Sequence, residues 1–102
     1  MLEITLDTNR MAWIEASSYP QGTMMKVLRD EDEARSVLLK LPAGFHMGAH
    51  SHTRCEQHLV WEGRYEMQGE EYGPGAYQCI PAHTTHGPFA SSGGAVVLVI
   101  WA

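Results

Sequence analysis

The sequence predicts an all-β domain in which many short strands form a small sandwich or barrel with little or no helix. Apolar residues recur mostly at every second position, which is the period of a β-strand. Turn-forming residues interrupt the chain roughly every eight to twelve positions. No segment carries an amphipathic stripe of helix length with a cap at both ends. Together these features are typical of antiparallel sandwiches and barrels.

The first half of the chain contains a predicted edge strand and a predicted hairpin. Residues 2–6 alternate apolar and polar side chains, so we expect a strand there that could also pair across an interface. Residues 23–28 and 36–41 are strand-length runs on either side of the acidic segment 30–33, which we interpret as the hairpin tip. The segment 42–44, Pro-Ala-Gly, then breaks the chain.

The second half predicts four further segments of strand. Residues 56–62 form a strand that ends at a glycine, and residues 65–72 form a short hairpin with its tip near Gln68-Gly69. A Gly-Pro-Gly turn precedes the strand at 76–80. The final strand, residues 95–101, is apolar at every position, which predicts burial on both of its faces.

The composition limits the classes of function. The chain has 102 residues, enough for a single domain over residues 1–102. Its net charge is −5 and its lysines and arginines are scattered, which argues against a nucleic-acid partner. The longest apolar run, residues 95–102, is far shorter than the ~20 residues of a membrane span. The N-terminus has no signal-like pattern. We therefore expect a cytoplasmic protein with no membrane partner.

The histidines are the main chemical signal. All six lie between positions 46 and 86. His50 and His52 form an HxH pair, and residues i and i+2 of a strand point to the same face, so their imidazoles should converge. Glu56 adds an anionic oxygen ligand four residues later, and His86 can reach the same place from another strand. The pattern indicates a site for one metal ion.

The spacing of these residues resembles the two motifs of the cupin family. The first motif spans residues 44–63 and reads Gly44-(x5)-His50-x-His52-(x3)-Glu56-(x6)-Gly63. The second spans residues 75–90 and reads Gly75-(x5)-Pro81-(x4)-His86. It departs from the family pattern at His83, where Gly is usual, and at Ala90, where Asn is frequent. His is tolerated at the Gly position because it is among the non-glycine residues found at positive φ.

The resemblance implies the fold, the ligand set and the cofactor. The fold would be a double-stranded β-helix, the jelly-roll barrel. Position by position, the implied ligands are His50, His52, Glu56 and His86. They would hold one divalent transition metal, Fe, Mn, Ni, Zn or Cu, between which the ligand set does not choose. Three imidazoles and one carboxylate leave one or two coordination positions open for substrate, water or dioxygen.

Further residues are candidates for the surroundings of the metal. Parity along the strands puts His46 on the face of His50 and puts His58 on the face of Glu56, so both are candidates for a catalytic or ligand-orienting role. Tyr65, Tyr77 and Phe89 are candidates for the wall of a substrate pocket.

Three functions fit these predictions. The first is a dioxygenase-like enzyme, of the Fe type, that acts on a small organic molecule. The second is a non-enzymatic metal- and ligand-binding or sensor domain. The third is a sugar or uronate isomerase or lyase, although the shortage of basic residues near the motifs makes a strongly anionic substrate less natural. We expect a homodimer, because the apolar final strand calls for a second covering surface.

A finer resemblance points toward the first two functions. It is to the cupin-like domains of zinc-binding anti-sigma factors and of acetylacetone dioxygenase. The positions that carry it are Trp13, Pro20-x-Gly22, residues 26–30 and residues 39–44.

Overall fold

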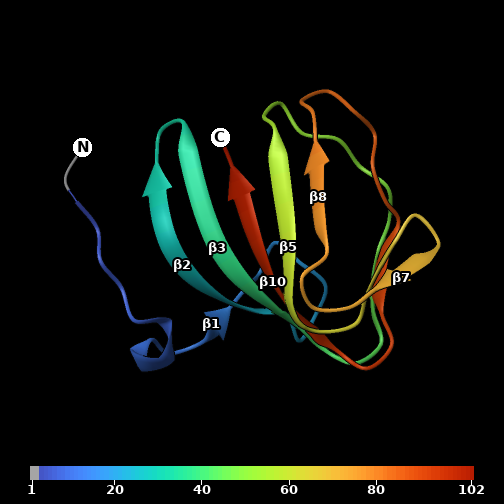
Figure 1. Cartoon of the computed structure of the whole chain (residues 1–102), viewed down its shortest axis with the longest axis horizontal. Coiled ribbons are helices and arrows are strands. Elements are labelled where there is room, and N and C mark those ends of the chain that lie inside the picture. The colour runs from blue at the N-terminus through green and yellow to red at the C-terminus, as the bar shows by residue number, and fades with distance from the viewer. Residues whose placement is uncertain (1–2) are drawn as a thin grey trace.

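The computed structural model describes residues 3–102 and contains two antiparallel β-sheets that share one core (Figure 1). The larger sheet has the order β1-β2-β3-β10-β5-β8 and the smaller sheet the order β4-β9-β6-β7. The larger sheet consists of β1 (Ile14–Glu15), β2 (Met24–Glu31), β3 (Ala34–Leu41), β10 (Ala95–Trp101), β5 (Glu56–Gly63) and β8 (Tyr77–Ile80). The smaller sheet consists of β4 (Phe45–Met47), β9 (Phe89–Ser91), β6 (Tyr65–Met67) and β7 (Glu70–Tyr72).

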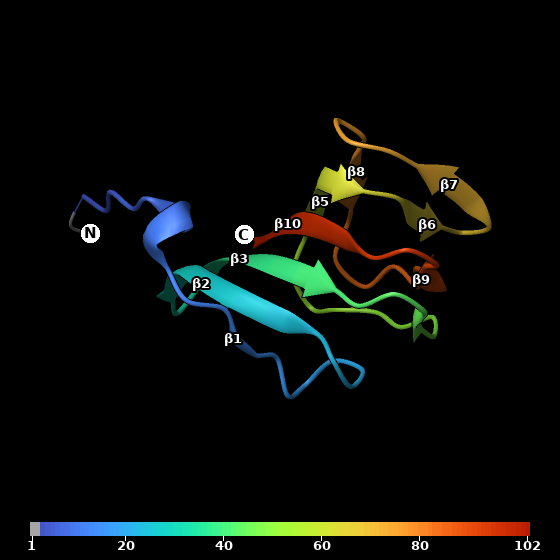
Figure 2. The same cartoon turned by 90° about the horizontal axis from the view of Figure 1, so that it is seen from below.

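The predicted all-β class is confirmed. Among residues 3–102 the only helical segment is the single 3-10 turn Thr8–Arg10. No helix in this part of the chain is long and apolar enough to cross a membrane. The final strand β10 lies between β3 and β5, so segments far apart in the sequence meet at the centre of the larger sheet, as Figure 2 shows.

Both predicted hairpins are confirmed. Strands β2 and β3 pair antiparallel from Met24↔Lys40 to Glu31↔Ala34, which leaves Asp32 and Glu33 at the tip. Strands β6 and β7 are joined by Gln68 and Gly69, with φ of 54° and 81°. Positive φ at both central residues is typical of the type I′ turn, whose twist matches that of a two-residue hairpin.

Two expectations about the ends of the chain are wrong. Residues 3–6 form no strand, and Ile4 and Leu6 stay about half exposed, because no ladder partner lies beside them. Leu2 lies outside the described residues. The final strand is buried on one face only: Val97 and Val99 are buried, while Val96, Leu98 and Ile100 are half-buried, because the smaller sheet covers only the inner face of β10.

The register of the larger sheet positions the functional site. Trp101 of β10 pairs with Arg35 of β3 on one side and with Glu56 of β5 on the other. Val99, two residues earlier, pairs with Val37 and His58 in the same way. Because side chains alternate between the faces of a strand, these two rungs point to the same side. Val37, Val99 and His58 are buried, so that side is the interior between the sheets.

Candidate metal centre

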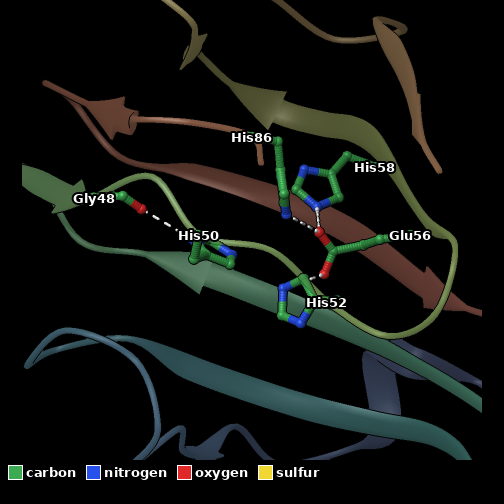
Figure 3. A network of polar contacts seen from close by, with 6 residues as sticks. All are labelled: Gly48, His50, His52, Glu56, His58 and His86. Atoms are coloured by element: carbon green, nitrogen blue, oxygen red, sulfur yellow. Dashed lines mark hydrogen bonds and ion pairs between the residues drawn. The ribbon is translucent and has the colours of Figure 1, made fainter. Parts of the chain in front are cut away.

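Four side chains converge at one end of this interior. His50 and His52 lie in the loop after β4, Glu56 begins β5, and His86 lies in the loop before β9. One potential ligand atom from each residue lies within 4.8 Å of those from all the others. Figure 3 shows three imidazoles pointing at the Glu56 carboxylate, with His50 beside them. The four residues that the two sequence motifs single out are therefore the ones that the fold brings close together.

Backbone hydrogen bonds hold these loops in place. The N–H of His50 donates to the carbonyl of His86 at 2.9 Å, and the N–H of His86 donates back to the carbonyl of His50 at 2.8 Å. The N–H of His83 donates to the carbonyl of His52 at 2.7 Å. His83 makes this bond with φ of 61°, the positive value expected at a position where Gly is usual in the motif. These bonds pair the backbone of His50 with that of His86, and the backbone of His52 with that of His83.

A side-chain contact also orients the ring of His50. Its Nδ1 lies 3.0 Å from the carbonyl oxygen of Gly48. A ring that donates from Nδ1 carries its lone pair on Nε2, so the contact presents Nε2 as the ligand atom.

The carboxylate is buried among the imidazoles. Only 3% of Glu56 and 2% of His86 is exposed. Nε2 of His52 lies 3.4 Å from Oε1 of Glu56, and Nε2 of His86 lies 3.4 Å from Oε2. Burial raises the pKa of Glu56, but the contact with His58 and the charges of His58, His52 and His86 outweigh it and lower the pKa below its usual value. Burial lowers the pKa of His86 to about 4, so its imidazole is neutral at neutral pH.

The donor atoms fit a metal ion. Both ring nitrogens of His86 are buried without a hydrogen-bond partner. Buried polar atoms are normally satisfied. A cation in the middle of the cluster would bind one of these two nitrogens together with the carboxylate of Glu56. Neutral imidazoles with a single carboxylate suit Fe(II), Mn(II), Ni(II), Zn(II) and Cu(II).

His58 stands directly behind the carboxylate. Its Nε2 lies 3.1 Å from Oε2 of Glu56, and only 4% of the residue is exposed. Its ring packs against the rings of Tyr65 and Phe89, with centroid distances of 5.9 Å and 5.4 Å, and those two rings stack on each other. The prediction that His58 shares the face of Glu56 is confirmed. His58 is placed to orient the carboxylate rather than to join the four converging side chains.

The corresponding prediction for His46 is wrong. His46 is exposed on β4, while Phe45 beside it is buried. Strand β4 ends at Met47, and the chain leaves regular extended geometry before it reaches His50. Parity therefore does not carry from His50 back to His46.

A cavity of about 590 Å³ extends from the cluster between the sheets. His50, His52, Glu56 and His58 form part of its wall, and most of the rest is apolar, from Leu39, Leu41, Phe45, Met47, Val97 and Val99. A volume of this size suits a small organic molecule.

The three aromatic residues predicted for the pocket have different positions. Tyr65 lines the cavity, and burial raises its pKa, so the phenol stays neutral. Phe89 is fully buried beneath the rings of His50 and His86 and is not part of the wall. Tyr77 is 59% exposed on the outer face of β8 and donates from its hydroxyl to Gln57, so its predicted role in the pocket is wrong. Tyr77 pairs with outward-facing Leu59, which puts it on the opposite face from the cavity.

The cavity residues that sequence reasoning missed include Tyr19, Arg35 and Trp101. Burial raises the pKa of Tyr19 to about 12, so its hydroxyl remains a donor. The guanidinium of Arg35 lies over the ring of Trp101 at 5.8 Å from the centroid. All three lie outside the two motifs. The pairing of β10 with β3 brings Arg35 to the site, and no local pattern in the sequence reveals that pairing.

Comparisons with known proteins show what the chain is similar to. Residues 1–101 match the model of a family described as the ChrR cupin-like domain. No curated protein sequence matches the chain. One similar solved structure is the complex of Rhodobacter sphaeroides SigE with the anti-sigma ChrR, at 23% identity and a TM-score of 0.74. That likeness covers 94% of this chain and 52% of the other, so the chain spans about half the length of that relative.

Two further structures resemble the chain over nearly its whole length. An acetylacetone dioxygenase from Acinetobacter johnsonii matches at 13% identity and a TM-score of 0.77, covering 99% of this chain and 73% of that one. KdgF from a Halomonas species matches at 23% identity and a TM-score of 0.76, covering 99% and 93%. At these identities the likeness extends to the fold alone.

Proposed function

The chain belongs to the ChrR cupin-like domain family, and on that premise we propose that it is a metal-dependent, dioxygenase-like enzyme of small organic molecules. The metal would be held by His50, His52, Glu56 and His86. The observation that carries the proposal is that three of these residues also form the wall of the 590 Å³ cavity, so a bound molecule would lie directly against the metal.

The residues around the cluster support chemistry as well as binding. A divalent metal, when bound, supplies Lewis-acid activation of a substrate oxygen and, in the case of Fe(II), chemistry with dioxygen. The apolar wall excludes water from the molecule beside it, which strengthens every polar interaction there. Tyr19 and Tyr65 remain neutral phenols that can donate a hydrogen bond or hold a proton. His58 keeps the carboxylate of Glu56 in one orientation.

Oxygen uptake tests the proposal. Protein reconstituted anaerobically with Fe(II) is mixed with air-saturated buffer and small diketones, phenols or thiols, and uptake is followed with an oxygen electrode. We expect substrate-dependent uptake from the wild type and from His46→Ala, whose histidine lies outside the cavity. We expect none from His50→Ala. Absence of uptake with every metal and substrate class would contradict an oxygenase.

A non-enzymatic sensor domain is the second candidate, and the family match favours it. One similar structure is a complex that contains an anti-sigma protein, and this chain covers about half of the matched chain. Such a domain would hold zinc tightly with no exchangeable water. Metal that exchanges slowly, together with the absence of turnover, would favour the sensor. Rapid exchange of a coordinated water would favour the enzyme.

We also infer that the protein is a cytoplasmic homodimer. The outer face of β5 and β8 carries Leu59, Trp61 and Tyr77, which are 38%, 49% and 59% exposed. Large apolar side chains gathered on one face support association with a second copy. Sedimentation velocity of the wild type should show a dimer, and Trp61→Glu should shift it toward monomer. A wild-type protein that is monomeric at all concentrations would contradict the dimer.

A further inference from the structure

We propose that the molecule bound beside the metal carries a carboxylate and that Arg35 binds it. The inference rests on the proposed function, because it assigns a substrate class to the same cavity. It also changes an expectation from the sequence, where the shortage of basic residues near the motifs argued against an anionic substrate. The cation comes instead from β3, which lies outside both motifs.

The sheet register brings Arg35 to the metal cluster. Arg35, Trp101 and Glu56 occupy one rung across the adjacent strands β3, β10 and β5, and their side chains leave on the same face. Neighbouring strands lie about 4.8 Å apart, so two strand spacings, about 10 Å, separate the backbones of Arg35 and Glu56. Trp101 stands between them on the rung, and all three residues line the cavity, so a short molecule lying against Trp101 could touch the metal at one end and Arg35 at the other.

The guanidinium is held in place and still has donors to offer. It lies over the Trp101 ring, an arrangement that orients its plane and leaves its edges available. Its Nε is buried without a hydrogen-bond partner. Its Nη1 is 3.7 Å from the Asp30 carboxylate, whose side chain is 60% exposed, so this ion pair is long and screened by solvent. A planar fork of this kind matches the geometry of a carboxylate.

The charges around the cavity also favour a ligand with a carboxylate. Arg35 is the only lysine or arginine in the described wall of the cavity. A divalent metal would outweigh the single carboxylate of Glu56, so the cavity as a whole would be positive. A smaller adjoining pocket of about 210 Å³ is lined by Arg35, Arg54 and His52 and adds a second guanidinium at this end. Tyr19, whose phenol stays protonated, also lines this cavity.

The wall limits the rest of the molecule. Apart from the histidines, Glu56, the tyrosines, Arg35 and Ser18, the cavity offers mainly aliphatic and aromatic side chains. A polyhydroxylated sugar would leave several hydroxyls without partners there, which is costly. A short oxo acid would place its carboxylate on Arg35, its carbonyl oxygen toward the metal and its carbon chain against the apolar wall. The substrate class is therefore a small oxo acid or a comparable monocarboxylate.

Matched pairs of compounds test this inference directly. Pyruvate, acetoacetate and levulinate are each compared with the diketone in which a methyl group replaces the carboxylate oxygen: butanedione, acetylacetone and hexane-2,5-dione. Binding to the metal-loaded protein is measured by calorimetry. At least one acid should bind the wild type about tenfold or more tightly than its neutral partner. Arg35→Met should abolish that preference, and Arg35→Lys should restore only part of it.

The controls separate this inference from the proposed function. Arg10→Met makes the same charge change at a side chain that is 87% exposed and lies outside the cavity wall, and it should bind like the wild type. Metal content is measured on every sample. A protein without metal would contradict the proposed function itself. The role of Arg35 would be overturned if the metal-loaded wild type binds no acid or prefers the diketones. It would also be overturned if metal-loaded Arg35→Met keeps the preference for acids. Neither result would contradict the metal centre.

Discussion

Nε2 of His58 lies 3.1 Å from Oε2 of Glu56, and both residues are almost completely buried on the same face of β5. One strand thus supplies both a candidate metal ligand and the group that orients it. When a residue that does not itself bind the metal contacts one of the metal's ligands in this way, its replacement commonly lowers metal affinity about 10–100-fold. The relationship divides the histidines of the site into those that would bind the metal and one that supports the carboxylate.

Replacement of His58 should weaken metal binding without abolishing it. His58→Gln removes the imidazole beside Oε2 while leaving the four converging side chains intact, so we expect metal affinity to fall about tenfold. Competition with a chromophoric chelator measures the change. His46→Gln is the matched control, because His46 is exposed on β4. Equal affinities in the two variants would show that His58 does not act on the carboxylate.

The metal-free protein should lose stability as the solution becomes acidic. The pKa of His86 is lowered from 6.5 to about 4 in the folded protein. Between these pH values the unfolded chain takes up a proton at this position and the folded protein does not, so the free energy of unfolding falls as pH falls. The lowered pKa of Glu56 extends the loss to more acidic solution, because the unfolded chain also protonates this carboxylate first.

Chemical denaturation of chelator-treated protein across this pH range measures the effect. His86→Gln removes the ionisable group and should flatten the profile between about pH 6.5 and pH 4.5, above the range of Glu56. Identical profiles for the wild type and His86→Gln would mean that His86 has no lowered pKa in the folded state.

Gly63 should be far less replaceable than Gly44. Both glycines have positive φ, 77° and 81°, which costs any L side chain about 1 kcal/mol. A Cβ at position 63 would also collide with the backbone of Gly94 and Ala95, whereas a Cβ at position 44 would meet open space. Urea unfolding should therefore show a loss of about 1 kcal/mol for Gly44→Ala and more than about 2 kcal/mol for Gly63→Ala. Equal losses would contradict the close approach of these strands.

The two cysteines should form a disulfide under mild oxidation. The Sγ atoms of Cys55 and Cys79 lie 3.7 Å apart on the outer side of the larger sheet, where Cys79 is exposed. Attack on oxidised glutathione gives a mixed disulfide, and the second thiol then displaces glutathione. Intact mass should show a protein lighter by two hydrogens, while Cys79→Ser should stop at the glutathione adduct. Stable adducts in the wild type would contradict the proximity.

The convergence of the four candidate ligands could be predicted from the sequence because motif spacing records local chain geometry. His50 and His52 lie in the loop after β4, Glu56 begins the next strand, β5, and His86 follows a turn in the second motif. The period-two pattern located most strands for a similar reason. His58 was found because β5 stays regular from Glu56 onward, so parity holds over two residues.

The remaining features depend on contacts that the sequence does not record. His46 was misplaced because β4 ends at Met47. Arg35 reaches the cavity through the pairing of β3 with β10, whose partners are 66 positions apart at Arg35↔Trp101. Tyr77 could have been excluded, because parity from the buried Ile80 puts it on the outer face of β8. Long-range register therefore decided which side chains surround the cluster.

Elemental analysis shows whether the four converging side chains hold a metal ion. Protein purified without a metal-affinity tag is analysed by elemental mass spectrometry, together with His50→Ala, His52→Ala and the exposed-loop control His83→Ala. We expect one transition-metal ion per chain in the wild type and in His83→Ala, and loss of that ion in both His50→Ala and His52→Ala. Full metal occupancy in His50→Ala, or a wild type without metal after reconstitution, would contradict this expectation.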